Sequence, residues 1–536
     1  MKIMLVCLVS MVISMTTATA APAQKNILFL LTDDGGFELG PYNNTMTETT
    51  HISALAAKGV TFDAAYTAVS SCSPSRSAIL SGLPTHQNGM YGLSQYPGNF
   101  QSNTDITSLP NVLNAAGYKT GILGKYHVNP EPNYGFQYGL GHGAGCHGAT
   151  CPCWAGCAAC TSSLPWSDVN GYDENYNQVT RNLTKMKLAA REFLNDIEPD
   201  KPFFLYVGFG DSHRCKYDDP YHGTFCEKWG DGGASGTIPD WTPKVFDPAK
   251  VPVPTWLPDT PETRRDIAAM YGAVNRMDQG VGVLVGEVER AGKLDSTLIV
   301  YFADNGIPYP SGKTNLHTQQ GMGEPLVISA PGAPASLHGT RSGAVVSSLD
   351  FVPTILDWAG VAWPNSATAH HHKATLTGAS LLPFVLGGEQ RKEAQWRNAA
   401  YASHQFHSLY AYYPMRAVVA PVNGTRYRLV RNLNYDLQFA ILEDVYGTDT
   451  WAAIQAAGEA GKPDGWIYTW DEYMRRPEWQ LFDADADPYS LHNLAATPGA
   501  AAPLAALQGQ LAQWRQVTHD PWAKCNTAAT GHECSI

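Results

Sequence analysis

Charged side chains are scarce in this sequence. Asp, Glu, Lys and Arg make up 16% of the 536 residues, against roughly 25% in an average soluble protein. The scarcity does not indicate disorder, because a disordered chain is also poor in apolar residues, and here hydrophobic residues reach 44%. The composition predicts a globular protein, and the length is enough for two domains with a large buried core.

A surplus of positive charge is missing as well. There are 36 Lys and Arg residues against 48 Asp and Glu residues, which gives a net charge of −12. A protein with this balance does not attract polyanions through its overall field, so we expect no nucleic-acid partner. An anionic substrate would have to be recognised by a local basic pocket.

Long apolar runs are absent after residue 20. No later stretch is apolar enough to span a bilayer, so we expect no membrane segment there. Residues 1–20 predict a secretory signal peptide, because Lys2 precedes an apolar run that ends in the small residues Ala18, Thr19 and Ala20. An uncleaved membrane anchor is the alternative, which the short run disfavours. We therefore expect a soluble protein of the secretory pathway, in an oxidising compartment.

The cysteines fit such a compartment. Cys215 with Cys226, and Cys525 with Cys534, flank short loops and predict two local disulfides. Five more lie in an insert at about 139–173: Cys146, Cys151, Cys153, Cys157 and Cys160. Their odd number leaves at least one unpaired or bonded to another chain. Two interpretations of the insert stay open. It is either a loop held together by disulfides, which the oxidising compartment favours, or a zinc-binding knot. Three N-glycosylation sequons, which a eukaryotic source would use, are at Asn43, Asn182 and Asn423.

Apolar runs alternate with helical segments over the first two thirds of the chain. Runs such as NILFLLT, PFFLYVG and TLIVYFA are typical of buried strands, and the stretch from about Glu262 to Ala291 has apolar residues at helical spacing. This alternation predicts an α/β fold with a mainly parallel sheet between helices. Later segments are shorter and aromatic-rich, which indicates a smaller α+β domain. The predicted division is a signal peptide at 1–20, a large domain at 21–370 that contains the insert, and a small domain at 371–536.

Polar side chains follow four of the predicted strands. They are Asp33 and Asp34, Lys125 and His127, Asp211 and His213, and Asp304 and Asn305. Ligands bind outside the carboxyl ends of the strands in an open α/β sheet, so we expect these side chains to meet. A single Asp at such a place could instead cap the next helix. The oxygen donors among them suit Ca²⁺ or Mg²⁺ better than zinc, which predicts a site for one divalent cation.

A fifth feature is the segment SSCSPSRSAILSG around Cys72. Pro74 favours a turn into a helix, so the free N–H groups of that helix would face residue 72. Arg76 adds a permanent cation beside the same point. The segment predicts an anion site directed at Cys72, and a structural disulfide of this cysteine is the alternative.

Together, the Cys-x-Pro-x-Arg segment, the Asp-Asp pair and the Asp-Asn pair resemble the signature of the type I sulfatases. The resemblance implies an alkaline-phosphatase-like fold. It also implies that a formylglycine-generating enzyme oxidises Cys72 to Cα-formylglycine. One divalent cation, usually calcium in lysosomal members, would be held by Asp33, Asp34, Cys72, Asp304 and Asn305.

The same resemblance suggests roles for the other polar residues. One hydroxyl of the hydrated aldehyde would attack sulfur, and the second would allow sulfate to leave. Four basic side chains are expected to stabilise the charge on the sulfo oxygens: Arg76, Lys125, His127 and Lys313. We expect His213 to protonate the leaving atom, with His127 as the second choice. Asp211 and His404 are the expected substrate-binding residues.

Further segments resemble, within this family, the members that remove the N-sulfate of glucosamine: DDGGFELGPYNN, YHGTFCEKWG, DNGIPYPSGKTNL, YPMR and THDPW. This implies a heparan-type glycosaminoglycan substrate, a homodimer, and a lysosomal location in a eukaryote or a periplasmic or extracellular one otherwise. The Cys-rich insert and the loop at about 404–413 look lengthened. Two alternatives therefore stay open: an exo-O-sulfatase for another sugar, and a secreted carbohydrate-binding homologue that keeps Cys72 as a thiol.

Overall fold

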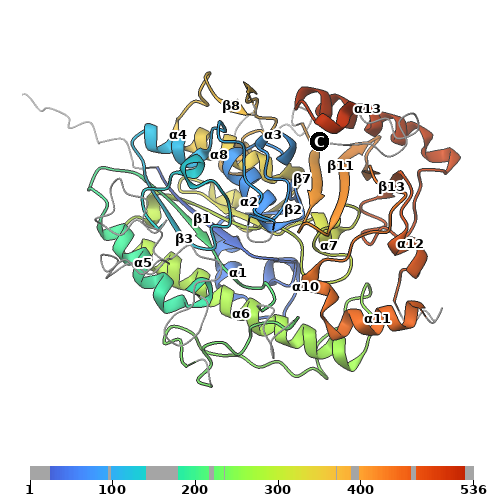
Figure 1. The fold of residues 1–536 in the computed structure, drawn as a ribbon. Helices are drawn as coiled ribbons and strands as arrows, with labels where there is room; N and C mark the ends of the chain where they lie inside the picture. The colour runs from blue at the N-terminus through green and yellow to red at the C-terminus, as the bar shows by residue number, and fades with distance from the viewer. Residues whose placement is uncertain are drawn as a thin grey trace, which may run out of the picture.

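A computed structural model describes residues 25–94, 98–139, 179–215, 223–233, 236–369, 371–387, 397–459 and 466–524. In this part of the chain a large sheet and a small sheet stand side by side (Figure 1). The predicted signal peptide, nearly all of the Cys-rich insert and the Cys525–Cys534 pair lie outside the described residues. No helix in the described ranges is both long and apolar enough to cross a membrane.

The large sheet has the strand order β3-β4-β1-β5-β6-β2-β7. Its strands are β1 (Asn26–Thr32), β2 (Val60–Tyr66), β3 (Lys119–Gly124), β4 (Phe203–Gly208), β5 (Thr297–Ala303), β6 (Leu326–Ser329) and β7 (Thr340–Ser347). All run parallel except β6, which is antiparallel to both β5 and β2. The predicted α/β fold with a mainly parallel sheet is thus confirmed, although the sequence indicated neither the reversal of β6 nor the existence of β7.

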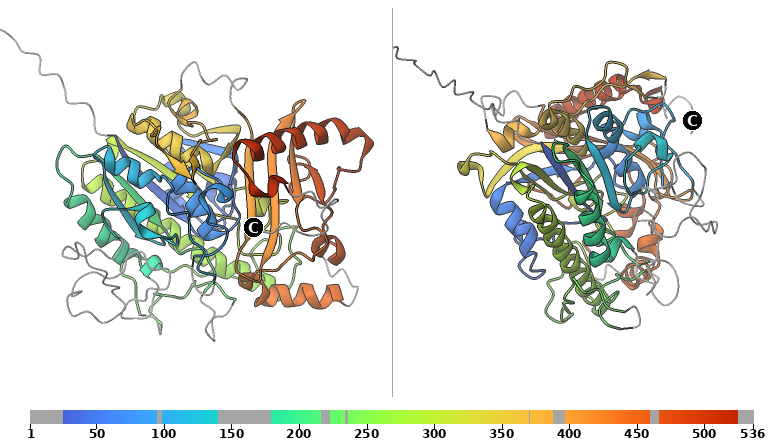
Figure 2. Two further views of the ribbon diagram at one scale, coloured as in Figure 1. Left: turned by 45° about the horizontal axis from the view of Figure 1, so that its top comes forward. Right: turned by 90° about the vertical axis from the view of Figure 1, so that its left-hand side faces the viewer.

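Strand β1 shows why the strand sequences are uninterrupted apolar runs. Ile27, Phe29 and Leu31 pack into one hydrophobic cluster, and Leu28 and Leu30 pack into another on the opposite face. Helices cover both faces (Figure 2), so every side chain of the strand is buried. The first cluster includes α2 (Cys72–Ser81), α4 (Leu109–Ala115) and α8 (Phe351–Ala359), and the second includes α1 (Thr50–Lys58), α5 (Leu183–Asn195) and α6 (Pro261–Arg290).

Short elements connect and border this core. They are the helices α3 (Thr85–Asn88), α7 (Gln319–Met322) and α9 (Leu382–Leu386), and the hairpin of β8 (Thr368–Ala369) and β9 (His372–Lys373). Helix α9 packs on the large sheet, since Leu382 and Phe384 belong to its core cluster. The predicted disulfide between Cys215 and Cys226 is confirmed.

The small sheet is antiparallel, in the order β10-β11-β12-β13. Its strands are β10 (Ala400–Phe406), β11 (Tyr412–Val422), β12 (Thr425–Asn432) and β13 (Trp479–Asp483). One face packs on α13 (Ala501–Val517). The other face packs on α10 (Glu443–Tyr446), α11 (Asp449–Glu459) and α12 (Trp470–Met474), and on large-sheet residues such as Tyr66 and Val345. Because residues of both sheets belong to this cluster, the small sheet is packed directly against the large one.

Candidate active site at the carboxyl edge of the large sheet

Four predicted polar clusters lie at the ends of neighbouring strands. The strands β3, β4, β1 and β5 stand next to one another and run in the same direction. The chain stays paired just beyond them, since Asp33 N–H donates to the Asp211 carbonyl at 3.0 Å and Asp304 N–H donates to the Thr32 carbonyl at 3.1 Å. The side chains after each strand therefore converge on one point of the edge.

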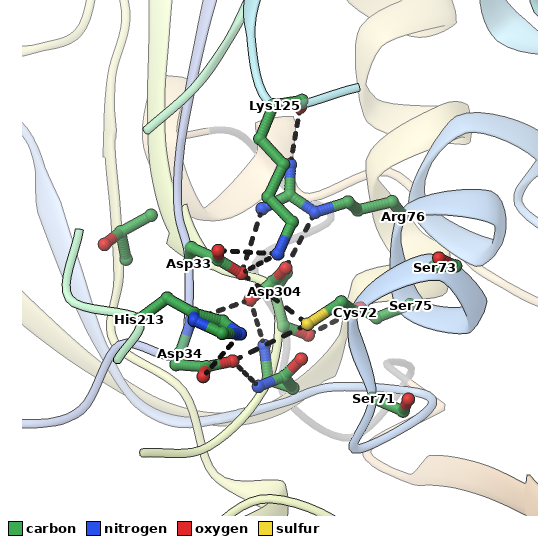
Figure 3. Close-up of polar contacts among 12 residues, drawn as sticks. Asp33, Asp34, Ser71, Cys72, Ser73, Ser75, Arg76, Lys125, His213 and Asp304 are labelled. Carbon is green, nitrogen blue, oxygen red and sulfur yellow. Dashed lines mark hydrogen bonds and ion pairs between the residues drawn. The ribbon is translucent and has the colours of Figure 1, made fainter. Parts of the chain in front are cut away.

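Cys72 lies at this point (Figure 3). It is the first residue of α2, it is buried, and its Sγ atom is 3.6 Å from Asp33 Oδ1 and 3.7 Å from Asp34 Oδ1. The thiol has no disulfide partner among the described residues, which disfavours the structural disulfide. Burial raises the pKa of the Cys72 thiol well above its usual value. An unmodified thiol here would stay protonated.

Two of the predicted cations bind the carboxylates beside Cys72. Lys125 Nζ is 2.6 Å and 2.7 Å from the two carboxylate oxygens of Asp33. Arg76 donates from Nε to Asp304 Oδ2 at 2.8 Å and from Nη1 to the Lys125 carbonyl at 2.7 Å. The guanidinium thus orients the carboxylates and the neighbouring strand end.

Lys313 and His213 approach from the other side of Asp34. Lys313 Nζ is 2.9 Å from Asp34 Oδ2 and 2.6 Å from Asp444 Oδ2. His213 Nε2 is 3.6 Å from the same two oxygens. His213 Nδ1 lies 2.7 Å from the Arg214 carbonyl, which can only accept, so Nδ1 carries a hydrogen and Nε2 faces the site.

The carboxylates and one amide fit a divalent cation. Asn305 donates from Nδ2 to Asp34 Oδ1 at 2.7 Å, while its buried Oδ1 atom has no hydrogen-bond partner within the described residues. Burial, with the negative charges of Asp33 and Asp34, raises the pKa of Asp304 to about 7, although Arg76 opposes the shift. A bound cation would compensate the negative charges of these carboxylates and would take the Asn305 Oδ1 atom as a ligand. Its ligands would be Asp33, Asp34, Asp304 and Asn305.

His127, Asp211 and His404 differ in their surroundings. Both ring nitrogens of His127 lack a partner within the described residues, and burial, aided by Lys125, lowers its pKa well below the usual value. The Asp211 carboxylate is bound by Arg276, at 2.7 Å and 2.8 Å, and by Arg181. The Asp211 carboxylate is therefore occupied by arginine side chains of the protein. Its backbone carbonyl accepts the hydrogen bond from Asp33 N–H. The His404 ring is buried, which lowers its pKa to about 3, and its Nδ1 has no partner in the described part of the chain.

Two residues of the site were missed by the sequence analysis. Asp444, in α10, contacts Lys313 and His213, and His407 Nε2 is 3.8 Å from Asp444 Oδ2. His407 Nδ1 is 2.9 Å from the Ser71 hydroxyl, next to Cys72. Asp444 belongs to no recognisable motif. His407 lies just beyond β10, so its proximity to His404 in the sequence was the one available signal.

Comparisons with known proteins agree with this geometry. The sequence model of the family described as Sulfatase matches residues 25–361. Human N-sulphoglucosamine sulphohydrolase is 44% identical over 499 residues, which cover 93% of this chain and 91% of that protein. Human arylsulfatase A is 28% identical over 423 residues, which cover 70% of this chain and 71% of that protein.

The fold also occurs in an enzyme that is named for another activity. The phosphonate monoester hydrolase of Silicibacter pomeroyi has a TM-score of 0.59 and 20% identity, with 96% of this chain and 99% of that chain covered. The architecture alone therefore does not define the reaction. The family match spans more than half of this chain, however, and the human relative matches nearly all of it. The resemblance inferred from the sequence motifs is confirmed, and the chain belongs to the sulfatase family.

Proposed function

We propose that this protein hydrolyses the N-sulfate of a terminal glucosamine in heparan-type glycosaminoglycans. The structural observation that supports hydrolysis of a sulfo group is the position of Cys72, at a helix N-terminus between Asp33, Asp34 and the buried cations. The identity of 44% to a human enzyme named for N-sulphoglucosamine supports the choice of nitrogen over oxygen.

The proposal includes two groups that the chain would acquire. Cys72 is converted to Cα-formylglycine by a formylglycine-generating enzyme, and its hydrate supplies a nucleophilic hydroxyl, while a bound Ca²⁺ or Mg²⁺ supplies Lewis acidity. Asp33, Asp34, Asp304 and Asn305, together with the modified Cys72, would hold the cation. The oxygen ligands fit either metal, and the family resemblance favours calcium.

The residues of the chain itself perform the remaining tasks. Lys125 and Lys313 place two ammonium groups beside Cys72, where they neutralise a bound sulfo group. His213 presents Nε2 to the site, which suits it to hold the proton for the leaving nitrogen. His127 brings a neutral imidazole with free hydrogen-bonding capacity. Burial of Cys72 and Lys313 excludes water and strengthens these interactions.

The test is a comparison of three substrates with the mature enzyme. Sulfate release is measured from N-sulfoglucosamine, from 6-O-sulfated N-acetylglucosamine and from an aryl sulfate, and peptide mass spectrometry reports the state of residue 72. We expect aldehyde or hydrate at residue 72 and the highest kcat/KM with N-sulfoglucosamine. Preference for the 6-O-sulfate would assign an O-sulfatase, and an unmodified thiol without turnover would assign a binding protein.

The cellular setting is part of the same proposal. We place the protein in the secretory pathway, and in the lysosome of a eukaryote, on the basis of the segment at residues 1–20 and the Cys215–Cys226 disulfide. Of the sequon residues, Asn43 and Asn423 are exposed, whereas Asn182 is buried and caps α5. The homodimer and the domain boundary at residue 370 stay predictions, which light scattering and limited proteolysis would test.

A further inference from the structure

The loop that carries Lys313 has an unusual backbone. It connects β5 to α7, and two residues close to Lys313, Ser311 and Thr314, have a φ of 71°. Side chains other than glycine rarely adopt this left-handed conformation, which persists only where surrounding contacts hold it in place. The contacts of this loop therefore help to decide where the Lys313 ammonium lies.

The side chain of Asn315 braces the loop from within. Its Nδ2 atom donates to the Gly312 carbonyl at 2.9 Å and to the Lys313 carbonyl at 3.3 Å. Its Oδ1 atom accepts from Arg476 Nη2 at 2.9 Å. A guanidinium can only donate, so this contact requires the amide oxygen to face Arg476 and keeps the amide nitrogen at the two carbonyls. Arg476 is thus linked to the backbone of Lys313 through a single side chain.

Arg476 comes from the small-sheet side of the molecule, just after α12, and it is 2% exposed. Besides Asn315 it contacts His317 Nδ1, at 3.1 Å from Nη1, and the Tyr473 carbonyl, at 3.0 Å from Nε. In the described part of the chain no carboxylate pairs with it, and burial lowers its pKa to about 10. A buried cation without an anion is costly, and an apolar side chain would fill the space without that cost. The hydrogen-bond donors of Arg476 are therefore what this position requires.

We propose that Arg476 is a positioning residue for Lys313, which acts through Asn315 on the loop at residues 311–318. The inference rests on the proposed function, in which Lys313 neutralises the bound sulfo group. A lysine side chain is flexible, so the place of its ammonium depends on an anchored backbone as well as on Asp34 and Asp444. The small-sheet side would thus contribute to the reaction without touching the substrate.

A double-mutant cycle tests whether Arg476 acts through Lys313. Sulfate release from an aryl sulfate is measured with the mature, metal-loaded wild type, Arg476→Gln, Lys313→Met and the double variant. We expect kcat/KM to fall by about 10²–10³-fold in Lys313→Met, as after loss of one transition-state donor. It should fall by about 10–10²-fold in Arg476→Gln, as after a displacement of about 1 Å. The double variant should match Lys313→Met within about twofold, because the position of an ammonium has no effect once that ammonium is absent.

The control removes another buried arginine of the C-terminal region. Arg515 is 5% exposed and binds Asp520 and the Trp522 carbonyl, and within its described contacts it does not reach residues 311–318. Arg515→Gln should lower the temperature of unfolding but keep kcat/KM within about twofold of the wild type. Thermal unfolding and metal content are measured for every variant.

Two results would overturn the inference. One is a double variant whose loss is the product of the two single losses, since Arg476 would then act independently of Lys313. The other is a wild-type kcat/KM in Arg476→Gln. If that variant does not fold, Asn315→Ala takes its place in the cycle and is judged in the same way, because it breaks the same link from the side of the loop.

The proposed function is tested separately, by release of sulfate from N-sulfoglucosamine. The cycle uses an aryl sulfate, so a different sugar specificity would leave its result unchanged. If the wild type turns over no sulfate ester, the same cycle is measured as the dissociation constant of inorganic sulfate. The double variant should then bind sulfate as weakly as Lys313→Met, and multiplied losses would again overturn the inference.

Discussion

Arg76 Nε donates to Asp304 Oδ2 across 2.8 Å, and both side chains are fully buried. The pair joins α2, which begins at Cys72, to the end of β5, which carries two of the proposed cation ligands. The helix that presents the nucleophile and the edge that would hold the cation are therefore fixed by one charged contact.

Removal of this contact should destabilise the fold. Arg76→Gln leaves Asp304 buried without its cation, and we expect the free energy of unfolding to fall by about 3–5 kcal/mol, as for other broken buried pairs. Denaturant unfolding measures this loss. Arg341→Gln is the control, because the Arg341–Asp63 pair is exposed and should contribute less than about 1 kcal/mol. Equal losses in both variants would contradict a special role for the buried pair.

Asp304→Ala should abolish metal binding. The change removes one anionic ligand from a small set of oxygen donors, so bound Ca²⁺ or Mg²⁺ and activity should be lost together. Elemental analysis of the purified protein measures the metal, with thermal unfolding to show that the variant is folded. An undiminished metal content would place the cation elsewhere.

His213→Gln should affect substrates according to their leaving groups. An amine needs a proton to leave, whereas an aryl sulfate releases a stable phenolate, so kcat should fall by about 10²–10⁴-fold on the sulfamate and much less on the aryl ester. Steady-state kinetics with both substrates provides the comparison. Losses of the same size on both would remove His213 as the proton donor.

Asp520 should make stability depend on pH in acid. Burial alone would raise its pKa, but Arg416, at 2.8 Å and 3.0 Å, and Arg515, at 2.9 Å, hold the pKa well below the usual range. A depressed pKa stabilises the folded state above the unfolded pKa of about 4, and this contribution is lost as the pH falls below that value.

We therefore expect Asp520→Asn to lower stability by about 3 kcal/mol at pH 7, and the difference from the wild type to shrink towards pH 2. Thermal or denaturant unfolding at several pH values measures the effect. Asp485→Asn is the control, since Asp485 pairs with Arg426 at the surface and should change stability little at any pH. A difference that stays constant below pH 4 would contradict the assignment.

The sequence by itself determined the type of sheet and most of the chemistry at its edge. Strand β1 is apolar at every position because both of its faces are buried, and that pattern is visible without coordinates. Asp33, Lys125, Asp211 and Asp304 follow such strands, and parallel strands end at one edge. The sequence therefore already indicated that these four side chains meet at one edge of the sheet.

Only the tertiary structure decided the direction of β6 and the part of the site that Asp444 and His407 form. A strand of four residues has the same apolar pattern in either direction, so its antiparallel pairing depends on neighbours far along the chain. Asp444 and His407 follow no motif and reach Lys313 and Ser71 because the small sheet packs against the large one. Such contacts depend on how two cores fit together, and local residue patterns carry no information about that fit.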